Sequence, residues 1–155
     1  MNPLYKRTPL KRSWIKRGKS VLKRSYIKKS RKSERQVLIN QLDQIVRDIL
    51  KLRDKVCQMT DAKEGLNVCH FISREVKACR WDLDNVILAT SGINCFWMNK
   101  YRTRYRDFMV KRIGEDKVIQ LEWKERKPAP IYTWQLKVLK LDLLEKLKYY
   151  QKKES

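Results

Sequence analysis

Apolar residues recur every three or four positions in two long stretches, residues 37–52 and residues 133–150. The apolar positions are Leu38, Leu42, Ile45, Ile49 and Leu52 in the first stretch, and Leu136, Leu139, Leu143, Leu147 and Tyr150 in the second. This period predicts two amphipathic helices, with Thr133 able to cap the second one. We expect the C-terminal helix to fold back on the first helix. Its pairing with a second copy of the chain, in a homodimer, is the alternative.

The segment between these stretches has the short apolar runs of a small sheet. Residues 66–72 and the run that begins at Val86 predict two strands. Residues 61–65 predict a turn before the first strand, because Gly65 can take a positive φ. Residues 73–80 predict a loop between the strands.

Two further helices are expected after the strands. The first should begin near Asn94, just after Gly92, and continue to Ile113, where Gly114 ends it. The second should run from residue 115 or 116 through Trp123. The whole pattern predicts an α+β fold that is mostly helical.

Residues 1–36 differ in composition from the rest of the chain. They contain fourteen Lys or Arg residues and one acid, Glu34. Self-repulsion and low apolar content predict an arm that stays disordered until it lies along phosphates. Its basic residues expected to bind DNA include Lys6, Arg7, Lys11, Arg12, Lys16 and Arg17. The remaining chain is divided into a domain at residues 37–127 and a C-terminal helix at residues 128–155, packed on that domain or on a second subunit.

The net charge of the chain is +21, from 38 Lys and Arg residues against 17 acidic residues. A field of this sign favours a polyanionic partner, and nucleic acid is the usual one. No apolar run approaches the roughly 20 residues that span a bilayer, and no secretory signal is found. We therefore expect a cytoplasmic protein, with Cys79 and Cys95 packed as thiols and not joined in disulfides.

The one histidine of the chain, His70, stands in a spaced set of polar residues. Asn85 follows fifteen residues later, directly before an apolar run, and Asn94 follows after nine more. A lone histidine is most often structural, but a neutral imidazole can also deprotonate water near pH 7. An asparagine amide can fix the orientation of an imidazole through a hydrogen bond. His70 and Asn85 are therefore candidate catalytic residues.

Three strings around these residues resemble the phage NinG/Rap recombination nucleases of the HNH superfamily. The strings are Leu52-Arg53-Asp54 with Cys57, Cys69-His70-Phe71-Ile72-Ser73-Arg74, and Arg80-Trp81-Asp82 with Asp84-Asn85. The resemblance covers roughly residues 35 to 150. It implies a ββα-metal core, in which His70 closes the first strand, Asn85 lies in the connecting loop and Asn94 opens a helix. It also implies a metal-dependent endonuclease that cuts branched DNA formed during recombination and replication.

The resemblance further implies a divalent cation, Mg²⁺ or Mn²⁺, beside the general base His70. Asn94 and Cys69 are the residues expected to help hold this ion. An ion with few protein ligands, completed by water and substrate phosphate, is typical of Mg²⁺. The basic residues expected to hold phosphates near the site are Arg74, Arg80, Lys100, Arg102 and Arg104.

Relatives of this kind usually carry two Cys-x-x-Cys knuckles that hold a structural zinc ion. The corresponding stretches here read Cys57-Gln58-Met59-Thr60 and Thr90-Ser91-Gly92-Ile93, so one of the four thiolates remains. Structural zinc needs four closed ligands, and we therefore expect none at this position.

Two other functions remain open from the sequence. The missing knuckle cysteines favour a non-cleaving DNA-binding protein with a degenerate HNH fold. The basic arm alone favours a small RNA-binding protein, which leaves the spacing of His70, Asn85 and Asn94 unexplained. Taken together, the sequence and the resemblance predict an endonuclease acting on branched or single-strand-containing DNA in the cytoplasm of a bacterial host cell.

Overall fold

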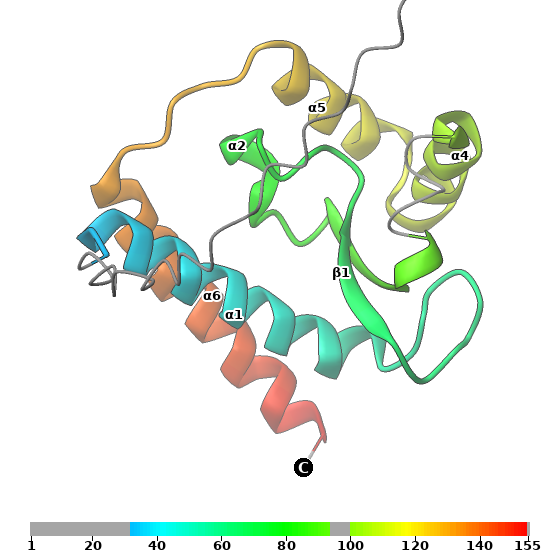
Figure 1. Ribbon diagram of the computed structural model, residues 1–155, viewed down its shortest axis with the longest axis horizontal. Helices are drawn as coiled ribbons and strands as arrows, with labels where there is room; N and C mark the ends of the chain where they lie inside the picture. Colours follow the sequence, from blue (N-terminus) through cyan, green and yellow to red (C-terminus); the bar gives the residue numbers. More distant parts are fainter. Residues whose placement is uncertain (1–31, 94–99, 155) are drawn as a thin grey trace, which may run out of the picture. The chain divides into compact units, whose positions relative to one another are not determined.

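The computed structural model describes residues 32–93 and 100–154, which belong to one compact unit. Its elements in chain order are α1 (Glu34–Asp54), β1 (Leu66–His70), α2 (Lys77–Arg80), β2 (Val86–Thr90), α4 (Arg102–Ile113), α5 (Glu115–Arg126) and α6 (Thr133–Glu154) (Figure 1). The fold is therefore mixed α+β and mostly helical, as the sequence predicts. The six arm residues predicted to bind DNA, together with Asn94 and Cys95, lie outside the described residues. No helix in the described ranges is long and apolar enough to cross a membrane.

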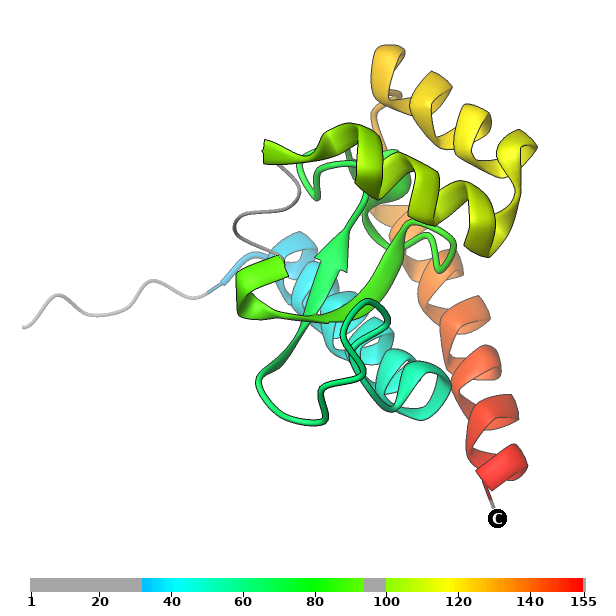
Figure 2. The ribbon, with the colours of Figure 1, turned by 90° about the vertical axis from the view of Figure 1, so that its right-hand side faces the viewer.

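Helices α1 and α6 lie along each other and run in the same direction (Figures 1 and 2). At one end, Arg35 Nη2 donates to the carbonyl oxygen of Ile131 (2.8 Å). At the other end, Lys55 Nζ lies 2.9 Å from a carboxylate oxygen of Glu154. The buried residues between them include Leu42, Ile49, Leu136 and Leu143 of the predicted apolar stripes. The C-terminal helix therefore shares a core with the first helix.

Strands β1 and β2 pair antiparallel, with Val68 opposite Leu88 and His70 opposite Val86. Successive side chains of a strand point to opposite faces of the sheet. Val86 and Leu88 accordingly join the core of α1 and α6. Cys69, Ile87 and Ala89 join a second core with Tyr105 and Met109 of α4 and with Val118 and Leu121 of α5. The two-stranded sheet thus separates two cores, and His70 shares the face of Val68, toward α1.

Three predicted boundaries are corrected by the structure. Helix α1 begins at Glu34, because the Ser33 hydroxyl caps it by accepting from Gln36 N (3.2 Å), so the arm ends before residue 36. Strand β1 ends at His70, two residues earlier than predicted, and residues 73–80 contain the short helix α2. A single helix from Asn94 to Ile113 is wrong, because Tyr101 has φ −130° and ψ 44° and α4 begins after it.

Asp54, the last residue of α1, joins three elements through its buried carboxylate. Its side chain is 1% exposed and accepts from Arg53 Nε (2.7 Å) and from Arg112 Nη2 of α4 (2.8 Å). It also accepts from the backbone N–H of Leu88 in β2 (2.9 Å). Arg53 in turn donates to the carbonyl oxygens of Leu83 (2.8 Å) and Val86 (2.7 Å). This network fixes the sheet against α1 and α4.

Candidate active site

His70 lines a pocket of about 430 Å³ between β1, α1 and the residues that connect the strands. Helix α1 contributes Asp43 and Arg47, which are one helical turn apart and so lie on the same face. The connection between the strands contributes Arg74 and the Arg80–Trp81 pair. The side chain of His70 enters this pocket because it points to the α1 side of the sheet.

The hydrogen bonding of His70 defines its tautomer. The imidazole Nε2 lies 3.1 Å from the carbonyl oxygen of Arg80. A carbonyl oxygen only accepts, so Nε2 carries the hydrogen and Nδ1 of the neutral ring keeps its lone pair. Nδ1 has no hydrogen-bond partner among the described residues. Burial lowers the pKa of His70 below its ordinary value of 6.5, and the positive charges of Arg80 and Arg74 act in the same direction. The imidazole is therefore neutral at pH 7 and can accept a proton at Nδ1.

Asn85 does not contact His70 directly. Its side chain is fully buried. Its oxygen accepts from Ile72 N (2.7 Å), and its nitrogen donates to the carbonyl oxygens of Ile72 (3.0 Å) and Cys79 (2.9 Å). These bonds hold the backbone one residue before the Arg80 carbonyl that accepts from His70. Asn85 thus restrains the backbone that leads to this carbonyl group, and among the described residues no side-chain hydrogen bond joins it to the imidazole.

Arg80, which is predicted to hold phosphate, lines the pocket but has its guanidinium bound by a carboxylate. Its side chain is 13% exposed, and its guanidinium donates to Asp43 through Nε (2.9 Å) and Nη2 (2.5 Å). Trp81 Nε1 donates to the same carboxylate (2.8 Å). Burial acts to raise the pKa of Asp43, but the hydrogen bonds from Arg80 and Trp81 outweigh it and lower that pKa. Asp43 is therefore ionised and neutralises Arg80.

Arg74 and Arg47 are the cations of this pocket that have no carboxylate partner. Both side chains are exposed, and within residues 32–93 and 100–154 neither forms an ion pair. The sequence predicts Arg74 but does not identify Arg47 as a candidate site residue. The spacing of four residues places Arg47 on the same face of the helix as Asp43. This spacing indicates a pocket residue only once β1 is known to lie beside α1.

Cys69 does not fit the predicted role of metal ligand beside His70. It is adjacent to His70 in the strand and so points to the opposite face, where it is fully buried in the second core. There the Tyr105 hydroxyl donates to its sulfur (3.6 Å). In the described residues, no group of three or more His, Cys, Asp or Glu side chains could hold a metal ion. The other predicted ligand, Asn94, lies outside them.

The four positions at which zinc ligands occur in the resembling family come together around Cys57. Burial acts to raise the pKa of the Cys57 thiol, but hydrogen bonds from Thr60 and from the backbone of Met59 and Thr90 lower it. Ile93 belongs to the same buried cluster as Cys57. Residues 60, 90 and 93 thus lie near Cys57, and they carry hydroxyl or apolar side chains where the resemblance implies further thiols.

The three basic residues predicted at the start of α4 lie apart from the His70 pocket. Arg102 Nη2 is 2.6 Å from a carboxylate oxygen of Glu125. Lys100 Nζ and Arg104 Cζ lie 5.8 Å and 5.5 Å from the ring centroid of Tyr101. These residues line another part of the surface, and only Arg74 of the predicted phosphate-binding set near the site is both in the pocket and without a carboxylate partner.

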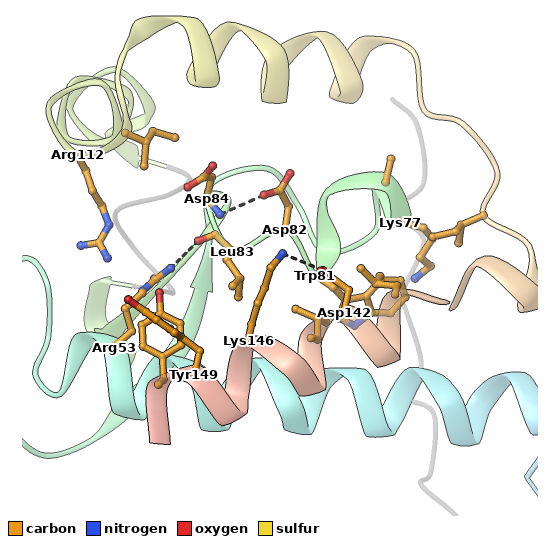
Figure 3. A pocket seen from close by; sticks show the side chains of 16 residues that line it. Arg53, Lys77, Trp81, Asp82, Leu83, Asp84, Arg112, Asp142, Lys146 and Tyr149 are labelled. Carbon is orange, nitrogen blue, oxygen red and sulfur yellow. Dashed lines mark hydrogen bonds and ion pairs between the residues drawn. The ribbon is translucent and has the colours of Figure 1, made fainter. Parts of the chain in front are cut away.

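A larger pocket of about 750 Å³ lies between the connection at residues 81–84, α4 and α6 (Figure 3). Its acidic residues are already paired with lysines. The pairs are Asp82 with Lys124, Asp84 with Lys117, and Asp142 with Lys146. Its two arginines, Arg53 and Arg112, belong to the Asp54 network. The smaller His70 pocket is therefore the better candidate site, because it combines a base with cations that have no carboxylate partner.

Comparison of the chain with family models, with curated proteins and with solved structures finds no match. The chemistry of the site is therefore inferred from its residues.

Proposed function

We propose that this protein is an HNH-type endonuclease that hydrolyses phosphodiesters of branched or partly single-stranded DNA. One observation carries the proposal. The His70 pocket combines an imidazole held neutral, with the lone pair of Nδ1 available, and two arginines that have no carboxylate partner. A base and cations for one phosphate group are the parts that phosphodiester hydrolysis requires.

In this proposal His70 accepts the proton of the attacking water at Nδ1. The water oxygen forms a bond to phosphorus, the bond from phosphorus to the leaving sugar oxygen breaks, and that oxygen receives a proton from solvent. Guanidinium groups bind phosphate oxygens in pairs, so Arg47 and Arg74 hold the phosphate and stabilise its growing charge. The Asp43 carboxylate favours the imidazolium that forms, because its charge raises the pKa of His70.

A divalent cation is expected from the resemblance. When bound, Mg²⁺ or Mn²⁺ would stabilise charge on the phosphate and on the leaving oxygen. Cys69 does not fit this ion, because its sulfur lies in the second core. The proposal assigns no step to the ion and attributes only the proton transfer and the phosphate contacts to this chain's own residues.

Two further observations support the proposal. The positions of the expected zinc knuckles converge around Cys57, as the resemblance requires of a chain that has lost the metal but kept the fold. Residues 1–31 contain twelve Lys or Arg residues and no acid, which suits contact with phosphates without sequence choice. The preference for branched DNA comes from the resemblance alone.

A non-cleaving DNA-binding protein is the second candidate function. The buried position of Cys69 favours this alternative, because the residue next to the proposed base then cannot bind a metal ion. The neutral His70 in a pocket with Arg47 and Arg74 opposes it.

Cleavage of end-labelled four-way junction, flap and plain duplex DNA tests the proposal directly. Each substrate is incubated with Mg²⁺, with Mn²⁺ or with EDTA, and binding is measured on the same DNA. We expect metal-dependent cutting of the junction or flap in preference to the duplex. Tight binding without cutting in either metal would establish the non-cleaving alternative.

The pH dependence of cleavage should report the lowered pKa of His70. A general base acts in its deprotonated form, so the rate rises with pH through the pKa and is constant above it. Because burial lowers that pKa, we expect the rate to reach half of its constant value below pH 6.5, the ordinary pKa of an imidazole. Single-turnover rates between pH 5 and pH 8 measure it. A rate that still rises between pH 7 and pH 8 would contradict His70 as the base.

Replacing Arg47 or Arg74 with alanine should weaken DNA binding equally for all sequences. Each lost phosphate contact should reduce the slope of log K against log salt concentration by about 1. Lys51→Ala is the matched control, because Lys51 is an exposed cation on α1 one turn after Arg47 and does not line the pocket. Salt titrations of binding to one junction would measure the slopes. Equal slopes for Arg47→Ala and Lys51→Ala would show that Arg47 does not contact a DNA phosphate.

A further inference from the structure

We propose that Asp43 of α1 is a positioning residue, which fixes the tautomer and orientation of His70 by holding the peptide group between Arg80 and Trp81. The role of Asp43 in catalysis rests on the proposed function, whereas its effect on the imidazole of His70 does not.

The contacts of Asp43 surround the carbonyl group on which His70 depends. The carbonyl oxygen of Arg80 accepts from His70 Nε2 (3.1 Å) and belongs to the peptide group that joins Arg80 to Trp81. Asp43 accepts from the side chains on both sides of that peptide group, at 2.9 and 2.5 Å from Arg80 and at 2.8 Å from Trp81. The Asp43 carboxylate thus restrains the residues on both sides of the peptide group whose carbonyl oxygen accepts from His70.

The same backbone segment is held from two other sides. Asn85 donates to the carbonyl oxygen of Cys79 (2.9 Å), one residue before Arg80. The Trp81 ring is 3% exposed in the core of α1 and α6. Asp43 is the one of these restraints that comes from α1, so it sets the position of the Arg80 carbonyl relative to the helix that forms the pocket wall.

The charge of Asp43 has a second effect on the pocket. Four charged residues lie around the imidazole, namely Asp43 and Arg47 from α1 and Arg74 and Arg80 from the connection between the strands. Because Asp43 binds Arg80 through two nitrogens, only Arg47 and Arg74 remain for a phosphate. Asp43 therefore keeps the Arg80 side chain from binding phosphate, while the Arg80 main chain orients the base.

The two variants at Asp43 should differ in stability. The Asp43 side chain is 38% exposed, and ion pairs that reach solvent contribute little to the free energy of folding. Its partners are more buried, since the Arg80 side chain is 13% exposed and Trp81 is 3% exposed, so Asp43→Ala leaves buried donors without an acceptor and should lower stability. Asp43→Asn keeps one acceptor oxygen, so we expect it to fold, with its main effect on the geometry of the peptide group that His70 contacts.

The first test measures the tautomer of His70 in the full chain without reference to catalysis. His70 is the one histidine of the sequence, so its ring nitrogens give unambiguous ¹⁵N signals. At pH 8, where the ring is neutral, the wild type should show hydrogen on Nε2. Asp43→Ala should show a mixture of the two tautomers, and Asp43→Asn an intermediate result, because the amide keeps one acceptor oxygen. The matched control is Asp48→Asn on the same helix, since in the part of the chain that the structure describes Asp48 accepts from Gln44 alone (2.9 Å).

The second test measures cleavage and binding of the junction by the same variants. Removing an outer residue that orients a functional imidazole typically costs about 10- to 100-fold in activity. We expect a loss of this size in the single-turnover rate for Asp43→Ala, binding within about twofold, and no loss for Asp48→Asn. Trp81→Phe removes one of the three hydrogen bonds and keeps a smaller aromatic ring in the core, so it should give a smaller loss and serves if Asp43→Ala does not fold.

The outcomes separate this proposal from the proposed function. A single unchanged tautomer in Asp43→Ala overturns the positioning role, whether or not the wild type cuts DNA. A changed tautomer with an unchanged cleavage rate overturns its importance for catalysis. A changed tautomer in a protein that binds DNA without cutting supports the positioning role and contradicts only the nuclease.

Discussion

Replacement of His70 with alanine should lower the rate of DNA cleavage by roughly 10²- to 10⁴-fold, the usual contribution of a general base. The reason is that no other group in the described pocket is a neutral base at pH 7, because Asp43 is occupied by Arg80 and Trp81. DNA binding should change by less than about twofold, since a neutral imidazole contributes no charge to the phosphate contacts that dominate binding. Single-turnover cleavage and binding of the same labelled junction measure both quantities.

His70→Gln is the matched variant for this prediction. Its side-chain amide can still donate to the carbonyl oxygen of Arg80, but it cannot accept a proton from water. Both variants should therefore be equally inactive. If His70→Gln kept the wild-type rate, His70 would be a structural residue and the base would lie elsewhere. If both variants lost binding as well as cleavage, the pocket would be needed for the fold or for affinity, and the proposed base would lose its support.

Replacement of Asp54 with alanine should destabilise the folded chain by about 3–5 kcal/mol, the usual cost of removing one partner of a buried ion pair. Its carboxylate is 1% exposed and accepts from two arginines and from the backbone of Leu88. The variant leaves Arg53 and Arg112 without their counter-charge at the junction of α1, β2 and α4. Urea unfolding followed by circular dichroism measures the loss.

The control for Asp54 is Asp48→Ala on the same helix. Asp48 accepts from Gln44 at an exposed position, so its loss should cost well under 1 kcal/mol, as at most surface positions. A similar loss of stability for the two variants would show that the Asp54 network is not what holds the sheet against α1.

Periodicity explains why the elements of the fold are predictable from the sequence. The apolar stripes of α1 and α6 each repeat over about four turns. Strand β2 is an apolar run, and β1 carries Leu66, Val68 and Cys69 directly after the turn at Gly65. The break at Tyr101 is not predictable, because aromatic and basic residues at helical spacing continue through it. The parallel direction of α1 and α6 depends on the path of the intervening chain and is not encoded in either stripe.

The sequence predicts those parts of the site that depend on one residue and its neighbours in the chain. It does not predict contacts between residues that lie far apart in the chain. His70 lies in a pocket at the end of its strand, as its neighbours in the sequence indicate. The pairing of Arg80 with Asp43 joins residues 37 apart, so the sequence predicts Arg80 as a phosphate ligand and misses Arg47. Cys69 is a different kind of error. Side chains alternate along a strand, so Cys69 is expected on the face opposite His70. The resemblance instead implies that Cys69 helps to hold an ion beside His70.

The parallel pairing of α1 with α6 has a consequence for the order in which the molecule can form. The core residues of α1 meet partners that are nearly 100 positions later in the chain, as in the contact between Arg35 and Ile131. Contacts of such separation form slowly, because closing so long a loop costs conformational entropy before the contacts repay it. During synthesis on a ribosome, the apolar face of α1 would remain exposed until α6 had emerged. Pocket walls that lie on α1 would then become fixed only after α6 had been made, so a cleaving site on this fold would stay inactive in nascent chains that lack α6.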